Sequence, residues 1–245
     1  MLIRNNSDNE AKKGYRTELK FLCSDFELEK IEMFISSVCM KDLHGDNSGI
    51  YRVRSLYFDS ADSRCYFESK EGVDNRNKYR IRIYDESKDF IRLEKKIGLH
   101  GKKRKESVQL SAEELNAIIN GSFDAKENDD KLFKEFATEC KAGLLPKLVV
   151  AYSRTAYTYP LGNVRITFDR EISAIPAYYF LESESGGIPV LPAGQSILEV
   201  KYDELLPDMI RDVLHRFELR STSFSKYVCC VESLFGIIPN HIGRE

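Results

Sequence analysis

Charged and apolar residues alternate with a period of two in several segments, and this alternation limits the fold more than any other feature. In KYRIRIY, Arg80 and Arg82 share one face, while apolar and tyrosine side chains occupy the other. Alternate residues point to opposite faces only in a strand. The predicted strands cover residues 16–22, 51–58, 78–84, 90–97, 107–110, 148–159, 163–168 and 196–202. The sequence therefore predicts at least eight strands.

Helices are predicted between some of these strands. Ser24 with Glu27, and Ser111 with Glu114, form the S-x-x-E pattern of a capping box at a helix start. Further helices are predicted near residues 129–141, 207–219 and 224–235. Because strands and helices do not alternate regularly, an α+β fold on a mostly antiparallel sheet is predicted. Closure into an antiparallel β-barrel of about eight strands, with helices packed outside, would remove the exposed sheet edges.

The chain is predicted to form one globular domain. Its 245 residues are 42% hydrophobic and 31% charged, and no linker or repeat divides them. We expect a loose tail at 1–14, one domain at 15–236 and a second tail at 237–245. No apolar run approaches the ~20 residues of a membrane span, which predicts a cytoplasmic protein without membrane insertion. The six cysteines show no metal-binding spacing and are expected to be reduced thiols.

Positive charge is concentrated in one part of the chain. Residues 76–105 contain twelve lysines and arginines against four acids, although the whole chain has a net charge of −2. Such a local excess favours an anion-binding surface. The basic residues of GLHGKKRKES, at 98–107, are predicted to lie in a hairpin turn.

Six predicted strands carry charged residues at alternate positions. These residues are Arg16, Glu18 and Lys20; Arg52 and Arg54; Arg80 and Arg82; Arg92, Glu94 and Lys96; Arg165 and Asp169; and Glu199 and Lys201. In one interpretation these faces meet solvent, as is usual for an antiparallel sheet. In the other they turn inward and line a barrel, where like charges repel unless a polyanion is bound.

A polyphosphate is the polyanion that fits an inward-facing arrangement best. Duplex nucleic acid needs an exposed basic groove, and the chain is slightly acidic overall. Single-stranded nucleic acid needs aromatic platforms among the cations, but most aromatic residues here fall on the opposite strand face. Lysine and arginine match phosphate oxygens without any base recognition. We therefore predict a phosphate ligand and no nucleic acid.

Three glutamates interrupt the cationic faces. Glu18, Glu94 and Glu199 could form salt bridges that space the cations apart, or could bind a hard divalent cation together with phosphate oxygens. Glu199 is the stronger metal candidate, because an unpaired carboxylate is costly in the otherwise apolar segment ILEVKY. The roles of the other two stay open. No P-loop, H-E-x-x-H, kinase or dinucleotide-binding motif is present.

The segments now described resemble one known family. YRVRSLYFDS, KYRIRIY, IRLEKKI, RKES, VVAYSRTAY, VRITFD, ILEVKYD and FSKY occur in the order expected of the VTC domain, from about residue 15 to 235. This domain is the catalytic module of vacuolar transporter chaperone polyphosphate polymerases and their bacterial stand-alone relatives. It belongs to the triphosphate tunnel metalloenzyme fold. The resemblance implies a basic tunnel that makes polyphosphate from the γ-phosphate of ATP with Mn²⁺ or Mg²⁺.

The resemblance also implies roles for individual residues. Those implied to act on the transferred phosphate are Arg80, Arg82, Lys96, Arg154 and Arg165. Those implied to bind substrate are Lys20, Lys105, Tyr152, Ser225 and Lys226, with Lys103 as the substitute if the alignment shifts at Lys105. Glu199 corresponds to the metal-binding glutamate.

The chain also departs from its relatives. Related triphosphatases carry E-x-E-x-K in the first strand, whereas this chain has R-T-E-L-K, with Arg16 in place of the first acid. Losing that carboxylate weakens water activation and favours phosphate transfer to phosphate. The SPX region and membrane helices found in many relatives are missing from the sequence. Any membrane-protein partner is unknown.

The resulting hypothesis is in-line transfer of the ATP γ-phosphate to a growing chain, whose ionised end needs no strong general base. A metal-dependent tunnel triphosphatase, a non-catalytic polyphosphate-binding module and a structural β-domain are the alternatives.

Overall fold

The computed structural model describes residues 16–42, 49–85, 87–99, 101–182 and 186–236. Its strands are β1 (Thr17–Ser24), β2 (Met40–Lys41), β3 (Ile50–Ser60), β4 (Arg76–Tyr84), β5 (Ser87–Leu99), β6 (Lys102–Leu110), β7 (Leu144–Tyr159), β8 (Val164–Pro176), β9 (Ile188–Pro189) and β10 (Gln195–Tyr202). Its helices are α2 (Asp25–Val38), α3 (Arg64–Lys70), α4 (Ala112–Ile119), α5 (Lys131–Lys141), α6 (Asp208–Arg216) and α7 (Lys226–Phe235). The predicted strands and helices are thus confirmed, with shifted boundaries. The predicted tails at 1–14 and 237–245 lie outside the described residues.

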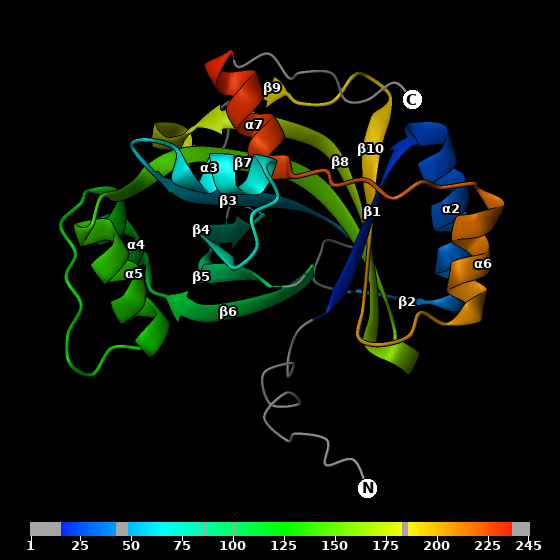
Figure 1. Cartoon of the computed structure of the whole chain (residues 1–245), viewed down its shortest axis with the longest axis horizontal. Helices are drawn as coiled ribbons and strands as arrows, with labels where there is room; N and C mark the ends of the chain where they lie inside the picture. Colours follow the sequence, from blue (N-terminus) through cyan, green and yellow to red (C-terminus); the bar gives the residue numbers. More distant parts are fainter. Residues whose placement is uncertain (1–15, 43–48, 86, 100, 183–185, 237–245) are drawn as a thin grey trace, which may run out of the picture.

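All the strands belong to one curled antiparallel sheet. Its main path runs β1-β10-β8-β7-β3-β4-β5-β6, with β2 beside β7 and β9 beside β8. The two edge strands meet at one point, where Arg16 and Lys103 exchange backbone hydrogen bonds of 3.0 and 3.2 Å. The sheet is therefore a barrel that is only partly closed, and it has a concave inner face and a convex outer face (Figure 1).

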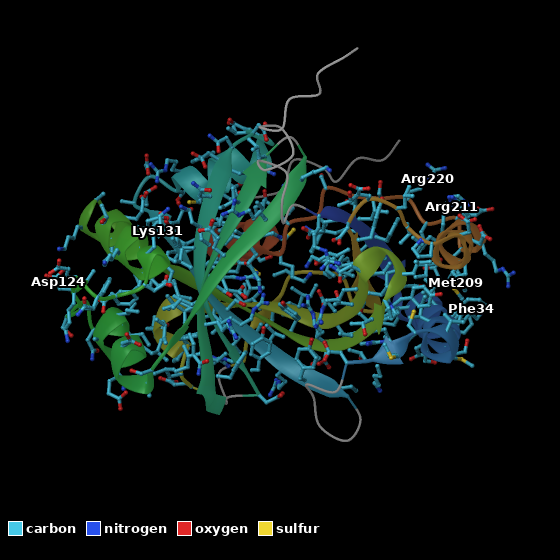
Figure 2. All side chains as sticks on the ribbon, turned by 90° about the horizontal axis from the view of Figure 1, so that it is seen from below. Phe34, Asp124, Lys131, Met209, Arg211 and Arg220 are labelled. Atoms are coloured by element: carbon cyan, nitrogen blue, oxygen red, sulfur yellow. The ribbon has the colours of Figure 1, made fainter. Side chains whose placement is uncertain are left out.

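Helices cover the convex face in two groups. α4 and α5 pack over the outer side of β4 and β5, in a core that includes Ile81, Leu93 and Phe136. α2 and α6 pack over β1, β8 and β10, around Phe168 and Leu198. The two groups lie at opposite ends of the molecule, where Asp124 and Lys131 mark one end and Phe34 and Met209 the other (Figure 2). This arrangement confirms the predicted α+β class.

α3 and α7 instead pack against one end of the concave face. Tyr227 of α7 stacks on Tyr57 of β3, with ring centroids 5.0 Å apart. Val228 and Val231 pack with inward-facing residues of β7 and β8. The Tyr227 hydroxyl donates a 2.5 Å hydrogen bond to Asp59, which also accepts the backbone N–H groups of Cys65 and Tyr66. α7 therefore closes one end of the concave face, and its first residues point toward the rest of that face.

Strand register identifies which charges face inward. β10 places Glu199 opposite Lys20 of β1 on one side and Thr167 of β8 on the other. β4 places Arg80 opposite Glu94 of β5. Because directly opposite residues share a sheet face, five of the six charged segments turn their charges to the concave face.

The prediction for the sixth segment is wrong. Arg54 lies opposite Ile83 of β4 and points to the convex side, as does Arg52, while the Arg54 guanidinium donates to the carbonyl of Tyr179. Tyr51 and Tyr57 face inward instead. The cause is packing, since this part of the concave face must contact α3 and α7. Tyrosines therefore do lie among the inward cations, contrary to the expectation from strand parity.

The basic segment after residue 98 also differs from its prediction. Its residues 102–105 belong to β6 and not to a hairpin turn, and they pair with β5. Alternation then places Lys103 and Lys105 on the concave face and Lys102 and Arg104 on the other.

Two further observations concern membrane-spanning helices and the cysteines. Within the described ranges, no helix is both long enough and apolar enough to cross a bilayer. All six cysteines are free, as predicted. Burial raises the pKa of Cys23 and of Cys65 to about 12, so these thiols are protonated at neutral pH.

Candidate functional site

A ring of alternating acids and cations lines the concave face, and we call it the charged ring. Its acids are Glu18, Glu94, Asp169 and Glu199. Its cations are Lys20, Arg80, Arg82, Lys96, Lys105, Arg154, Lys201 and Lys226. They come from seven strands and from the first turn of α7, so residues distant in sequence converge on one face.

Glu94 is the centre of one half of the ring. Its carboxylate accepts hydrogen bonds from Arg80 Nε at 2.7 Å and Lys105 Nζ at 2.7 Å, and Arg82 lies 3.9 Å away. The side chain is fully buried, with 0% of the residue exposed. Burial alone would raise the pKa of this carboxyl, but the three cations outweigh it and hold the pKa far below its usual range. Glu94 is therefore ionised and fixes two of the predicted catalytic arginines.

Asp169 is the centre of the other half. Arg154 donates to it twice, at 2.6 and 2.7 Å, and the Lys226 ammonium lies 2.7 Å away. Asp169 is also 0% exposed. Burial opposes its ionisation, but Arg154 and Lys226 lower the pKa of this carboxyl below its ordinary value. The two cations are thereby held side by side on the concave face.

Glu18 and Glu199 join the two halves along the β1–β10 pair. Glu199 contacts the Lys201 ammonium and lies 3.9 Å from that of Lys226. Glu18 lies 3.3 Å from the Lys20 ammonium and 3.3 Å from that of Lys96. Burial would raise the pKa of Glu18, but the lysines lower it to about 2 despite repulsion by Glu199. Both carboxylates are therefore charged at neutral pH.

Two tyrosines connect the arginines of the ring. The Tyr57 hydroxyl accepts a 2.8 Å hydrogen bond from Arg80, and that of Tyr152 accepts one of 3.3 Å from Arg82. The Tyr152 ring also lies under the Arg154 guanidinium, with 5.0 Å from its carbon to the ring centroid. Burial would raise the pKa of Tyr152, yet Arg154 and Arg82 lower it. Tyr152 thus spans the gap between Arg82 and Arg154.

Two predicted site residues lie outside the ring. Arg165 lies at the rim, where it contacts Asp42 at 2.6 Å and donates to the Tyr51 hydroxyl at 3.2 Å. The Ser225 hydroxyl accepts the Val228 N–H at 3.5 Å and caps α7. Ser225 therefore positions Lys226, which begins the helix.

The site also contains residues to which the sequence assigned no role. Asp169 and Lys201 stood out only as members of charged strand faces, and strand parity placed Tyr57 opposite Arg52 and Arg54. Alternation could have selected the first two, because Lys201 shares a face with Glu199 in β10 and Asp169 shares a face with Arg165 in β8. Tyr57 carries no such signal, since its orientation depends on contacts with α7.

Comparison with known proteins identifies the family. The sequence pattern of the VTC domain matches residues 15–235. The chain belongs to the VTC domain family. This assignment confirms the predicted triphosphate tunnel fold and makes the chain a tunnel-fold, phosphate-handling protein.

A solved structure supports the fold of this VTC domain. It is similar to a candidate adenylate cyclase from Bacillus halodurans, with 15% identity and a TM-score of 0.52 over 86% of this chain and 95% of that one. It is also similar to the PH1819 protein of Pyrococcus horikoshii, with 17% identity and a TM-score of 0.49 over 89% and 99% of the two chains. At these identities the likeness concerns the fold alone. Comparison with curated proteins finds no match.

The carboxylates of the VTC domain fit a divalent metal ion, which tunnel enzymes generally use. Glu18 Oε2 is buried and accepts no hydrogen bond from any described residue, although the Lys96 ammonium lies 3.3 Å away. Glu18 and Glu199 also repel each other, which a cation between them would relieve. Hard carboxylate oxygens beside a phosphate site match the preference of Mg²⁺ and Mn²⁺. Among the described residues, no cluster of three or more histidine, cysteine, aspartate or glutamate ligands is present.

The cations of the ring outnumber its acids eight to four. Burial lowers the pKa of Lys96 to about 7, with Lys20 and Lys201 adding to the repulsion although Glu18 opposes them. The ring is therefore short of negative charge.

We expect tripolyphosphate to raise the melting temperature of the VTC domain. A ligand that binds only the folded state stabilises it by about 2.7 kcal/mol at a concentration of a hundred times Kd. The measurement is a thermal unfolding titration, with sodium chloride at matched ionic strength as the control. A melting temperature that does not depend on tripolyphosphate would mean that the ring does not bind phosphates.

Proposed function

We propose that this VTC domain synthesises inorganic polyphosphate by transferring the γ-phosphate of ATP to a growing phosphate chain. The observation that carries the proposal is the convergence of eight cations on four ionised acids, whose side chains are buried, across one concave face. Acids hold the cations in place before the substrate binds, and such preorganised charge stabilises phosphoryl transfer without reorganisation during the reaction. A cytoplasmic location, where ATP is available, is part of the proposal.

The proposed step is an in-line displacement. An ionised oxygen of the terminal chain phosphate attacks the γ-phosphorus, the bond from this phosphorus to the bridging β,γ-oxygen breaks, and ADP leaves with the electron pair. The nucleophile is already ionised, so no side chain has to remove a proton. Arg80, Arg82 and Lys96 neutralise the transferred phosphate, and Arg154 and Lys226 neutralise the flanking phosphates.

The other predicted residues have supporting roles in this proposal. Lys20 and Lys105 contact chain phosphates, Arg165 attracts nucleotides at the rim, and Tyr152 holds Arg82 and Arg154 in position. Glu199, together with Glu18, would hold the divalent metal, which when bound supplies charge neutralisation to the triphosphate.

A tunnel triphosphatase is the second candidate, and the position of Arg16 argues against it. Arg16 Nε lies 3.1 Å from the carboxylate of Asp203 at the rim, and its guanidinium also contacts the carbonyl of Asn163. The first strand therefore brings Glu18 but no second carboxylate to the ring, which leaves fewer groups to activate a water molecule.

Incubation of the purified domain with ATP and Mn²⁺ or Mg²⁺ tests the proposal. We expect a ladder of polyphosphate chains on a gel, formed together with ADP. Orthophosphate with ADP and no chains would instead identify a triphosphatase. Phosphate-dependent stabilisation without any turnover would identify a binding module.

A further inference from the structure

A second group of cations lies beside the charged ring on the same face of β4, β5 and β6. Register places three lysines directly opposite one another in the row Lys78–Lys96–Lys105. The next row away from Glu94 is Arg76–Gly98–Lys103. These two rows contain five cations and no acid. Like charges directly opposite each other destabilise a sheet unless an anion compensates them.

Three of these cations have no acidic partner in the part of the chain that the structure describes. Lys96 and Lys105 reach the acids of the ring, Glu18 and Glu94 respectively. Arg76, Lys78 and Lys103 form no ion pair with any residue that the structure describes. We call these three the acid-free group.

Two members of the acid-free group meet over Gly98. Arg76 and Lys103 both extend over this residue: a side chain added there would begin 3.2 Å from Lys103 Nζ and 3.6 Å from an Arg76 carbon. On the inner side, the Lys78 ammonium lies 5.3 Å from the ring centroid of Tyr227 in α7. Glycine at position 98 thus lets the two basic side chains lie close together over the strand, where one phosphate group could contact both.

The surroundings of Lys78 disfavour its charge. Burial lowers the pKa of Lys78 to about 7, and Lys20, Arg76 and Lys103 lower it further, while the Cys65 thiol acts in the opposite direction. Burial and Arg76 also lower the pKa of Lys103, although the charges of Glu18 and Asp74 raise it. An anion bound beside Arg76, Lys78 and Lys103 would reduce the repulsion among these cations and favour their charged forms.

Arg76 and Lys103, the outer row of the acid-free group, are too far from the ring arginines for one triphosphate to reach both. Lys78 lies between these two sets, opposite Lys96 of the ring. Arg76 precedes Arg82 by six residues in β4, which at ~3.3 Å per residue places their Cα atoms about 20 Å apart. A triphosphate bound at Arg80 and Arg82 therefore ends before Arg76. A linear chain that continues along β4 would reach Lys78 first and then Arg76 and Lys103.

We propose that Arg76, Lys78 and Lys103 form a second phosphate subsite, which holds the continuing phosphates of a linear chain and makes the domain prefer long polyphosphate to triphosphate. The inference rests on the proposed function in one respect, that the ring binds phosphate chains. It adds the determinant of chain length, which lies outside the ring.

Binding measurements on Lys103→Met test the subsite. Methionine keeps an apolar stem of similar length over Gly98 and removes only the charge. Loss of one charge-assisted contact is expected to weaken binding of a size-fractionated long polyphosphate by about tenfold. Binding of tripolyphosphate is expected to change by less than about twofold, because a triphosphate bound at Arg80 and Arg82 ends before the row of Arg76 and Lys103. Isothermal titration calorimetry gives both affinities.

Two further variants make the result specific. Arg76→Met should show the same selective loss. Lys102→Met, one residue away from Lys103 in β6 but on the convex side, should leave both affinities unchanged. Equal loss for the two ligands in Lys103→Met, or no loss for either, would overturn the subsite. Failure of the wild-type domain to bind either ligand would instead overturn the proposed function.

Discussion

Replacing Arg82 with alanine is expected to lower ATP-dependent polyphosphate synthesis by at least about a hundredfold. The Arg82 guanidinium donates to Ser55 at 3.1 Å and to Tyr152 at 3.3 Å, which aims it at the centre of the concave face. It lies 3.9 Å from Glu94, so it is not fully occupied by that acid and can contact a transferring phosphate. Preorganised cations lose most of their effect on the rate when one of them is removed.

Arg82 suits this test because its loss leaves the remaining charges paired. Glu94 keeps Arg80 at 2.6 Å and Lys105 at 2.7 Å, so no buried carboxylate loses its neutralisation. We therefore expect a melting temperature within a few degrees of the wild type. Arg80→Ala would be less informative, because it removes the closest partner of Glu94 and would lower stability as well.

The measurement is the rate of ADP release together with the chain ladder, at saturating ATP. Arg104→Ala is the matched control, because Arg104 lies in β6 on the convex side and contacts Glu106. The control should keep its activity. If Arg82→Ala were as active as Arg104→Ala, Arg82 would have no part in the transfer, and the assignment of the ring as the catalytic site would be wrong.

The sheet was predictable from the sequence because its signal is local. Alternation in KYRIRIY and ILEVKY determines which residues share a face, and the capping boxes at Ser24 and Ser111 mark helix starts that the structure contains. The inward direction of the charged faces was one of two interpretations. The repeated choice of long cations on several strands favoured it, because solvent-facing strands rarely require them.

What the sequence could not predict depends on contacts between distant segments. β3 alternates as strongly as its neighbours, yet its arginines Arg52 and Arg54 face outward, because tyrosines on its other face pack against α7. Ser225 likewise belongs to the matching motif, but its hydroxyl is used by the helix N-terminus. Strand parity and motif order contain no information about either contact.

The acids of the ring illustrate the same limit. The sequence left open whether Glu94 forms salt bridges or binds metal, and its contacts with Arg80, Arg82 and Lys105 now support the salt-bridge role. Asp169 received no role, although it holds two cations in place. Cross-strand partners decide these roles, and the register is known only once the sheet is assembled.

Replacing Asp169 with asparagine is expected to destabilise the domain by about 3–5 kcal/mol. The substitution keeps the shape of the side chain but leaves Arg154 and Lys226 buried beside a neutral amide. The nearest remaining acid is Glu199, at 3.9 Å from the Lys226 ammonium. For a chain of this length the loss corresponds to a fall in melting temperature on the order of 10 °C.

Two comparisons make this prediction specific. Asp124→Asn removes an exposed acid that pairs with Lys141 at the end of the molecule (Figure 2), and should change stability by less than about 0.5 kcal/mol. Tripolyphosphate should stabilise Asp169→Asn more than the wild type, because the ligand then supplies the missing negative charge to Arg154 and Lys226. If Asp169→Asn and Asp124→Asn had equal free energies of unfolding in urea, Asp169 would not hold Arg154 and Lys226 together.

The pH dependence of the same pair gives an independent check. Burial acts against ionisation of Asp169, but Arg154 and Lys226 lower the pKa of this carboxyl in the folded state. Its contribution to stability is therefore complete above the unfolded pKa of about 4 and is lost as the pH falls through the lower folded value. The advantage of the wild type over Asp169→Asn should be constant from pH 6 to about pH 5 and should narrow below about pH 4. An advantage that instead grew toward acidic pH would contradict a lowered pKa and, with it, the charge pairing that holds Arg154 and Lys226 on the concave face.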